Sequence, residues 1–115
     1  MKYGLPDTAI QKISAVLSRC PRVDEAILYG SRAKGSYKNG SDIDLALRGG
    51  ADLTLQVVYG IIEELDDLLL PYTIDLAILG DIEDPDVMDH IRRVGITFYK
   101  KGQAVSEPAA VAQAE

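Results

Sequence analysis

Apolar side chains follow two different spacings along the chain, and the two alternate from the N-terminus onward. Spacings of three and four residues, typical of helices, occur in three stretches: residues 7–20, 55–69 and 85–94. Short apolar runs bounded by turn residues, typical of strands, lie between and after them: residues 25–29, 42–47, 72–79 and 96–99. The pattern therefore predicts three long helices and four strands.

Alternating helices and strands with short links are typical of a single sheet covered by helices. We predict an α/β or α+β domain in which a small mixed sheet of about four strands packs against three or four helices. A chain of 115 residues has room for one such domain. We assign residues 1–102 to it and expect residues 103–115, which lack periodicity, to form a flexible tail.

The segment from residue 30 to residue 41 is rich in Gly, Ser and Lys, fits neither spacing and predicts a loop with at most one helical turn. Gly30 and Ser31 come directly after a strand, where a glycine lets backbone N–H groups approach an anion closely and a serine adds a hydroxyl donor. Arg32, Lys34 and Lys38 place three cations within seven positions of an acidic chain. The loop is therefore predicted to bind phosphate.

Three aspartates stand on the second and third predicted strands. Strand alternation puts Asp42 and Asp44 on one face, where two carboxylates repel each other, and Asp75 stands alone among aliphatic residues. Magnesium ions prefer carboxylate and phosphate oxygens, and a pair of them can stabilise both oxygens of a phosphoryl transfer. If the two strands are neighbours, the three acids can meet in such a site.

The charge balance changes which substrates are plausible. With 12 Lys and Arg against 18 Asp and Glu, the net charge of −6 makes nucleic acid an unfavourable partner. The single cysteine, Cys20, excludes an internal disulfide and fits a reducing compartment. No apolar run is long enough to span a membrane and no signal peptide is evident, so we expect a cytoplasmic protein.

Taken together, Gly30-Ser31, ten further residues and then Asp42-Ile43-Asp44 resemble the GS-x10-DxD signature of the DNA polymerase β-like nucleotidyltransferases. Asp75 falls one strand later, as the third acid does in that superfamily. In its short length and in the sequence of its loop, the chain resembles the minimal nucleotidyltransferases, which are encoded beside HEPN-domain proteins in prokaryotic toxin–antitoxin pairs. The resemblance extends from about Pro6 to Tyr99.

The resemblance implies a role for each of these positions. Gly30 and Ser31 would bind the nucleotide phosphates, with the cations Arg32 and Lys34 close by. Asp42 and Asp44 would bridge two Mg²⁺ ions, and Asp75 would complete the catalytic metal site and help to activate the acceptor hydroxyl.

The family transfers a nucleoside monophosphate from an NTP, here expected to be ATP, to a hydroxyl and releases pyrophosphate. In toxin–antitoxin members the acceptor is a tyrosine of the HEPN toxin, which adenylylation inactivates. The resemblance thus implies an antitoxin.

Two alternatives stay open at the level of sequence. The same chemistry could act on RNA or on a small hydroxylated molecule, or the domain could neutralise a partner by occlusion with little catalysis. A chain this small with exposed strand ends is also expected to associate with itself or with its partner. Tyr29, Tyr37 and Arg48 are left without an assigned role, and His90, with no second His or Cys in range, is predicted to be a surface or interface residue.

Overall fold

The computed structural model describes residues 1–102, so the expected tail at 103–115 lies outside the described residues. The described chain forms, in order, α1 (Asp7–Ser18), β1 (Val23–Tyr29), α2 (Ser31–Lys34), β2 (Ile43–Gly49), α3 (Leu55–Asp66), β3 (Ile74–Ile78), the 3-10 turn η1 (Leu79–Asp81), α4 (Pro85–Val94) and β4 (Ile96–Lys100). Every predicted helix and strand is present, and the helical turn expected in the loop is α2. Within these residues, no helix is long and apolar enough to cross a membrane.

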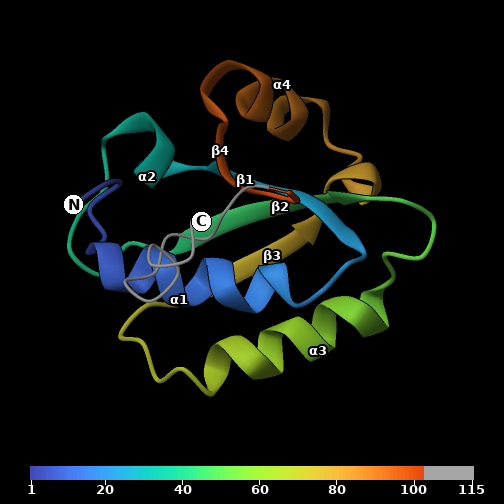
Figure 1. Ribbon diagram of the computed structural model, residues 1–115. Coiled ribbons are helices and arrows are strands. Elements are labelled where there is room, and N and C mark those ends of the chain that lie inside the picture. The colour runs from blue at the N-terminus through green and yellow to red at the C-terminus, as the bar shows by residue number, and fades with distance from the viewer. Residues whose placement is uncertain (103–115) are drawn as a thin grey trace.

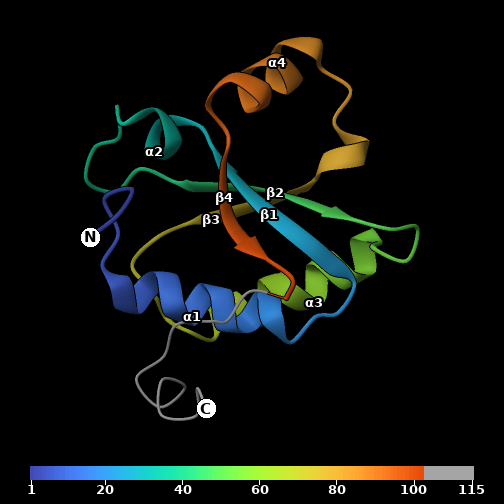
Figure 2. The ribbon, with the colours of Figure 1, turned by 45° about the horizontal axis from the view of Figure 1, so that its top comes forward.

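The strands form a mixed sheet in the order β3-β2-β1-β4. β1 runs antiparallel to both β2 and β4, whereas β2 and β3 are parallel neighbours. Helices α1 and α3 cover one face of this sheet, and α4 lies over the other face with α2 near its margin (Figures 1 and 2). The prediction of a small mixed four-stranded sheet covered by helices is therefore confirmed for the described residues.

The hydrophobic core lies between the sheet and the pair α1 and α3. On β2, Ile43, Leu45 and Leu47 are fully buried in this core. Because side chains alternate across a strand, Asp44 must then face the opposite side of the sheet, beneath α4. Burying the aliphatic residues of β2 thus fixes where its acidic residues point.

Helix α3 is shorter than its apolar pattern suggested. The predicted stripe ran to Leu68 or Leu69, but the helix ends at Asp66, and Leu69 lies in the following turn with a positive φ of 56° and 87% exposure. Val58, Ile61 and Leu65 already supply the buried face of the helix. Of the two alternatives for the end of the stripe, Leu68 is partly buried against the core, whereas Leu69 is exposed because the chain reverses there toward β3.

Arg32 on α2 is buried, with only 3% of its surface exposed. Its Nε and Nη2 donate to the carbonyl oxygen of Ser41 (3.1 and 2.8 Å), and its Nη1 donates to that of Tyr3 (2.8 Å). The guanidinium lies over the rings of Tyr37 and Tyr72, 5.5 and 5.3 Å from their centroids. Arg32 therefore joins the N-terminal segment, α2 and the residue before Asp42, whereas the sequence had suggested a phosphate contact.

Replacing Arg32 by methionine should destabilise the fold, because the aliphatic stem remains but the carbonyl groups of Ser41 and Tyr3 lose their donors. We expect a loss of about 2–4 kcal/mol in the free energy of unfolding, measured with urea. Lys34→Met is the matched control, since Lys34 lies on the same helical turn but is exposed. An Arg32→Met protein as stable as this control would contradict the structural role.

Candidate active site

The turn between β1 and α2 is shaped around Gly30. Its backbone has φ 77° and ψ −158°, a conformation that L side chains rarely adopt. A Cβ atom at this position would also collide with the carboxylate of Asp44. The backbone conformation therefore favours glycine, and the turn lies directly against the Asp44 side chain, which would have to shift to admit a Cβ atom.

Ser31 and Lys34 begin and end the short helix that follows this turn. The carbonyl of Gly30 accepts a hydrogen bond from the backbone N–H of Lys34 (3.1 Å), which closes the helical turn. Ser31 is half-buried beside Gly30, and the Lys34 side chain is exposed. Of the four residues predicted to meet phosphate, Gly30, Ser31 and Lys34 thus lie in one segment next to Asp44, while Arg32 points into the protein.

The aspartates come together across the parallel strands. Asp44 and Asp75 are aligned in the register of β2 and β3, and their side chains are close enough for Asp75 to raise the pKa of Asp44. Asp42 immediately precedes β2, is exposed, and is close enough to act electrostatically on Asp44. The structure thus places Asp44 and Asp75 side by side on neighbouring strands, with Asp42 near enough to Asp44 to act on it electrostatically.

Negative charge is concentrated at this point of the sheet. Burial raises the pKa of Asp44, and the nearby charges of Asp75 and Asp42 raise it further, while His90 acts in the opposite direction. Burial, Asp44 and Asp75 likewise raise the pKa of Tyr29, which pairs with Asp44 across β1 and β2. A bound cation would compensate the negative charge of these carboxylates.

The donor set fits magnesium in its chemistry. Mg²⁺ binds carboxylate oxygens and keeps several positions for water and phosphate oxygens, so two adjacent carboxylates and an exposed third are sufficient. In the part of the chain that the structure describes, no group of three His, Cys, Asp or Glu side chains is placed to hold a metal ion as it stands. Asp44 and Asp75 therefore form the candidate centre, and Asp42 is its exposed neighbour.

His90 belongs to this region, although the sequence gave no sign of it. The Nε2 atom of His90 accepts a hydrogen bond from the backbone N–H of Gly30 (3.0 Å). Its ring also packs edge-on against Tyr29, with centroids 6.3 Å apart and planes at 76°. His90 was predicted to be a surface or interface residue, and the sequence did not indicate this contact, which arises because α4 folds back over β1 and carries His90 to the Gly30 turn.

Two residues without an assigned role find partners away from the acids. Arg48 pairs with Glu25 at 3.0 Å, and Thr97 donates to the same carboxylate at 2.6 Å. These hydrogen bonds with Thr97 and Arg48, together with the charge of Arg48, lower the pKa of Glu25 against the opposing effect of burial. Tyr37 packs against Arg32. Both Arg48 and Tyr37 thus have structural partners in place of a ligand.

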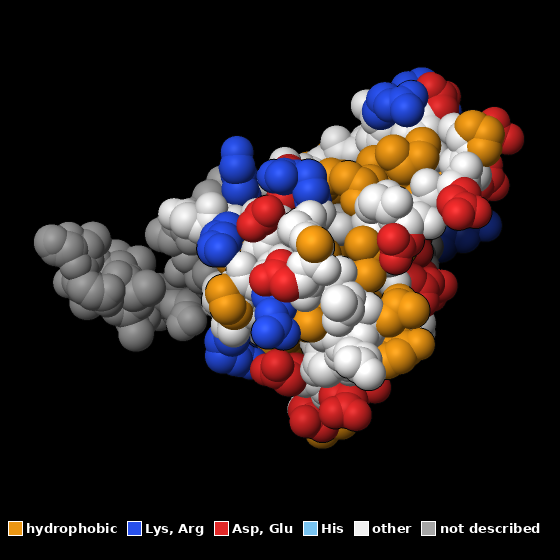
Figure 3. Space-filling model, turned by 90° about the vertical axis from the view of Figure 1, so that its right-hand side faces the viewer, with side chains coloured by type: hydrophobic (Ala, Val, Ile, Leu, Met, Phe, Trp, Pro, Cys, Tyr) orange, Lys and Arg blue, Asp and Glu red, His pale blue; other side chains and the backbone are white. Residues whose placement is uncertain are grey.

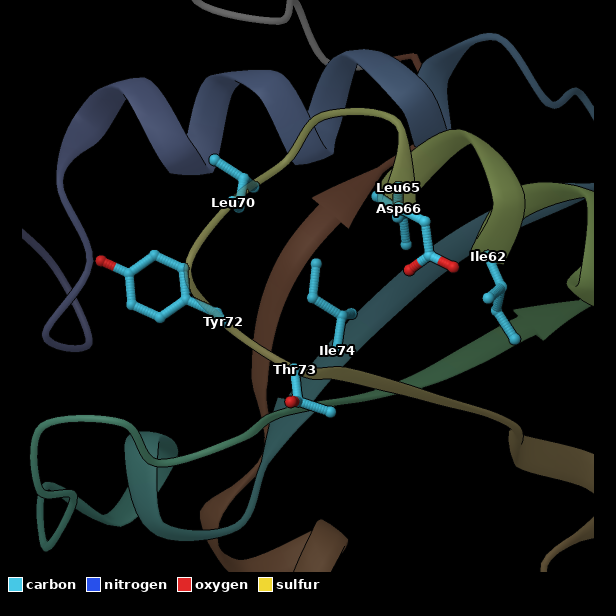
Figure 4. A pocket seen from close by; sticks show the side chains of 7 residues that line it. All are labelled: Ile62, Leu65, Asp66, Leu70, Tyr72, Thr73 and Ile74. Carbon is cyan, nitrogen blue, oxygen red and sulfur yellow. The ribbon is translucent and has the colours of Figure 1, made fainter.

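Two hollows on the surface of the described residues lie away from the aspartate pair. One pocket of about 190 Å³ lies between α3 and β3, lined by Ile62, Leu65, Asp66, Leu70, Tyr72, Thr73 and Ile74 (Figure 4). Ile74 points into it, so Asp75, the next residue on the strand, faces away from it. The chemistry of the acids makes the open sheet face, and not this pocket, the candidate site.

A second, wider groove of about 450 Å³ lies at the far end of β2 and β3, between η1 and α4. Ile78, Leu79 and Met88 contribute to its lining, together with Arg48. On the side of the molecule shown in Figure 3, hydrophobic side chains gather with acidic side chains around them. This groove lies about 13 Å along β2 from Asp44, at roughly 3.3 Å per residue.

Solved structures with the same fold include complexes and single proteins. A toxin–antitoxin crystallised with AMP-PNP superposes with a TM-score of 0.63 at 21% identity, over 86% of this chain and 77% of that one. A candidate minimal nucleotidyltransferase gives a TM-score of 0.62 at 26% identity, over 84% of this chain and 95% of that one. The complex of a tri-AMPylated Shewanella oneidensis HEPN toxin with its MNT antitoxin gives 0.59 at 18% identity, over 82% and 71%.

Sequence comparison gives the family directly. No curated protein matches the chain at a significant level. The family model for the nucleotidyltransferase domain of polymerase beta matches residues 11–104, which is most of the chain and includes the Gly30 turn and all three aspartates. This protein therefore belongs to the polymerase beta-like nucleotidyltransferases, and its solved structural neighbours include minimal nucleotidyltransferases and the MNT antitoxins of HEPN toxins.

Proposed function

We propose that this protein transfers AMP from ATP to a hydroxyl group of a partner protein, a HEPN-domain toxin, and so acts as its antitoxin. The observation that carries the proposal is the contact between Asp44 and Asp75 on an open sheet face, directly beside the Gly30-Ser31 turn. Metal-binding acids and a phosphate turn are the two parts that nucleotidyl transfer needs.

The aspartates would hold the metal. A pair of Mg²⁺ ions, when bound, supplies the positive charge that offsets the charge of the triphosphate and of the transition state. Asp44 and Asp75 would ligate them from the paired strands, and Asp42 would complete the set from the residue before β2. The raised pKa of Asp44 supports this assignment, since a bound cation would relieve the repulsion that contributes to it.

The loop would hold the nucleotide. The Ser31 hydroxyl and the Lys34 ammonium group would contact phosphate oxygens, while Gly30 lets the turn come close to Asp44. Arg32, whose donors are engaged with the backbone, is left out of this set and supports the loop from beneath. The phosphates and the acids would then lie within a few ångströms of each other.

The reaction would be an in-line displacement at the α-phosphorus. The acceptor oxygen forms a bond to the α-phosphorus as the bond to the bridging oxygen breaks, and pyrophosphate leaves with that oxygen. The proton of the acceptor hydroxyl passes to Asp75, which is exposed on the edge strand of the sheet. Asp75 would therefore serve both as a metal ligand and as the proton acceptor.

A protein acceptor is favoured over the alternatives. Several solved neighbours are toxin–antitoxin complexes, and one of those toxins is AMPylated. The net charge of −6 disfavours RNA. A tyrosine of a HEPN toxin is accordingly the proposed acceptor.

Asp44→Asn and Asp75→Asn should each abolish transfer of label from α-³²P-ATP to the partner, with a loss of at least about 100-fold in rate, because each removes a metal-binding charge. Asp67→Asn is the matched control, since Asp67 is an exposed aspartate just beyond α3, the helix on the opposite face of the sheet. Undiminished transfer by both site variants would refute the assignment.

The acceptor is tested in parallel reactions with the HEPN protein encoded beside this one, with RNA and with an aminoglycoside. Labelling of the HEPN protein alone, lost when its tyrosines are changed to phenylalanine, is the expected result. Labelling of RNA or of the aminoglycoside would favour the alternative acceptors. If the Asp44→Asn protein still protected cells from the toxin, neutralisation by occlusion would be the better account.

Asp44→Asn should also raise the stability of the metal-free protein at neutral pH. The pKa of Asp44 is higher in the folded state than in the unfolded chain, so stability falls as pH rises through the interval between the two values. The increase in the free energy of unfolding caused by Asp44→Asn should therefore become smaller once the pH is below the ordinary pKa range of an aspartate. Thermal unfolding of both proteins at several pH values measures it.

Magnesium provides the complementary measurement. Added Mg²⁺ and ATP should raise the melting temperature of the wild-type protein and leave that of Asp44→Asn nearly unchanged, because a ligand stabilises only a state that binds it. If metal-free Asp44→Asn were less stable than the metal-free wild type at neutral pH, the stability prediction would be contradicted and the Asp44 carboxylate would contribute to the fold.

A further inference from the structure

We propose that His90 is a positioning residue of the nucleotide site, which fixes the Gly30 peptide so that the phosphate turn stays against Asp44. This inference rests on the proposed function and adds to it a residue outside the GS-x10-DxD segment. Its basis is the hydrogen bond from the Gly30 N–H to Nε2 of His90, which joins residues 60 positions apart.

Gly30 needs an external restraint more than other residues of the turn. Glycine is favoured there by its positive φ, yet glycine is also the residue with the greatest backbone freedom. Its carbonyl is held locally by the N–H of Lys34. Its N–H is held by His90. The two peptide groups that flank the Gly30 Cα are thus each held by one hydrogen bond, and one of the two bonds comes from α4.

The imidazole ring is itself well placed for this task. Nε2 accepts the hydrogen bond, so the ring hydrogen lies on Nδ1. The edge-on contact with Tyr29 orients the ring from the strand that leads into the turn. Asp89, the preceding residue, pairs with Arg93 on the exposed side of the helix at 2.8 Å. Neighbouring charges of α4 therefore point outward, and His90 is the residue that α4 directs at the turn.

The hydrogen bond from Gly30 to His90 also determines which donors of the turn are available to bind phosphate. Because the N–H of Gly30 is already engaged by His90, phosphate binding falls to Ser31 and Lys34, and Gly30 contributes shape. Losing the restraint should then weaken nucleotide binding, because the turn would have to be ordered at the moment of binding. The chemical step, which depends on the aspartates, should change less.

The test compares His90→Leu, which removes the acceptor, with His90→Gln, whose side-chain oxygen can accept in place of Nε2. Asp89→Asn is the control on the same helix. Calorimetry with Mg²⁺ and α,β-methylene-ATP, which cannot transfer AMP, should give a dissociation constant about five-fold higher for His90→Leu, the equivalent of one neutral hydrogen bond. His90→Gln and Asp89→Asn should bind as the wild type does.

Transfer assays provide a separate measurement. The effect of His90→Leu should appear there as a higher KM for ATP, with kcat nearly unchanged.

A second readout does not depend on nucleotide. An N–H···N hydrogen bond gives a scalar coupling between the two nitrogens, which ¹⁵N NMR should detect between Gly30 and His90 in the wild type. His90→Leu should also accelerate amide hydrogen exchange at Gly30, and His90→Gln should restore its protection. If His90→Leu bound nucleotide with wild-type affinity, or if both His90 variants lost affinity equally, the positioning role would be overturned.

If the proposed function itself were wrong, the same experiments would give a different set of results. In that case the wild-type protein would transfer no label and Asp44→Asn would behave as the wild type, whereas the Gly30–His90 coupling would still be present. Conversely, active transfer that depends on Asp44 but not on His90 would leave the proposed function intact and overturn only this inference.

Discussion

The contact between Asp44 and Asp75 is the constraint around which the rest of this fold is arranged. Two carboxylates side by side on paired strands oppose folding. Within residues 1–102 neither of them forms an ion pair with a Lys or Arg side chain, and Arg48 on β2 pairs with Glu25 instead. The fold tolerates them because the opposite faces of the same strands bury aliphatic side chains such as Leu45 against α1 and α3. Stability is thus supplied on one face of the sheet and chemistry is placed on the other.

How far the sequence predicts this structure depends on the range of the interaction concerned. Alternation within β2 is local, so the opposite placement of Leu45 and Asp44 could be predicted from the residues alone. The meeting of Asp44 with Asp75 required the further condition that β2 and β3 are neighbours, which the structure meets. The end of α3 was misplaced because the apolar pattern continues to Leu69 after the core is already filled.

Arg32 and His90 show what local patterns cannot reveal. A basic residue in a glycine-rich loop suggests a phosphate ligand, but Arg32 is buried because the carbonyl groups of Tyr3 and Ser41 reach it from elsewhere in the chain. A lone histidine on a helix suggests a surface or interface residue and gives no partner within the chain, but the packing of α4 over β1 brings His90 to Gly30. In both cases the partners are distant in sequence, and no spacing rule connects them.

The charge of the site has a further consequence for the order of events under the proposed function. A triphosphate approaching Asp42, Asp44 and Asp75 is repelled, and Lys34 is the one cation of the proposed phosphate ligands that is exposed on the turn. Nucleotide and magnesium must then bind with strong mutual dependence, because each reduces the repulsion that the other meets. Such coupling is reciprocal, so the nucleotide strengthens metal binding by the same factor. An acidic pair that is unfavourable in the empty protein thereby makes the site selective for nucleotide that arrives with its metal.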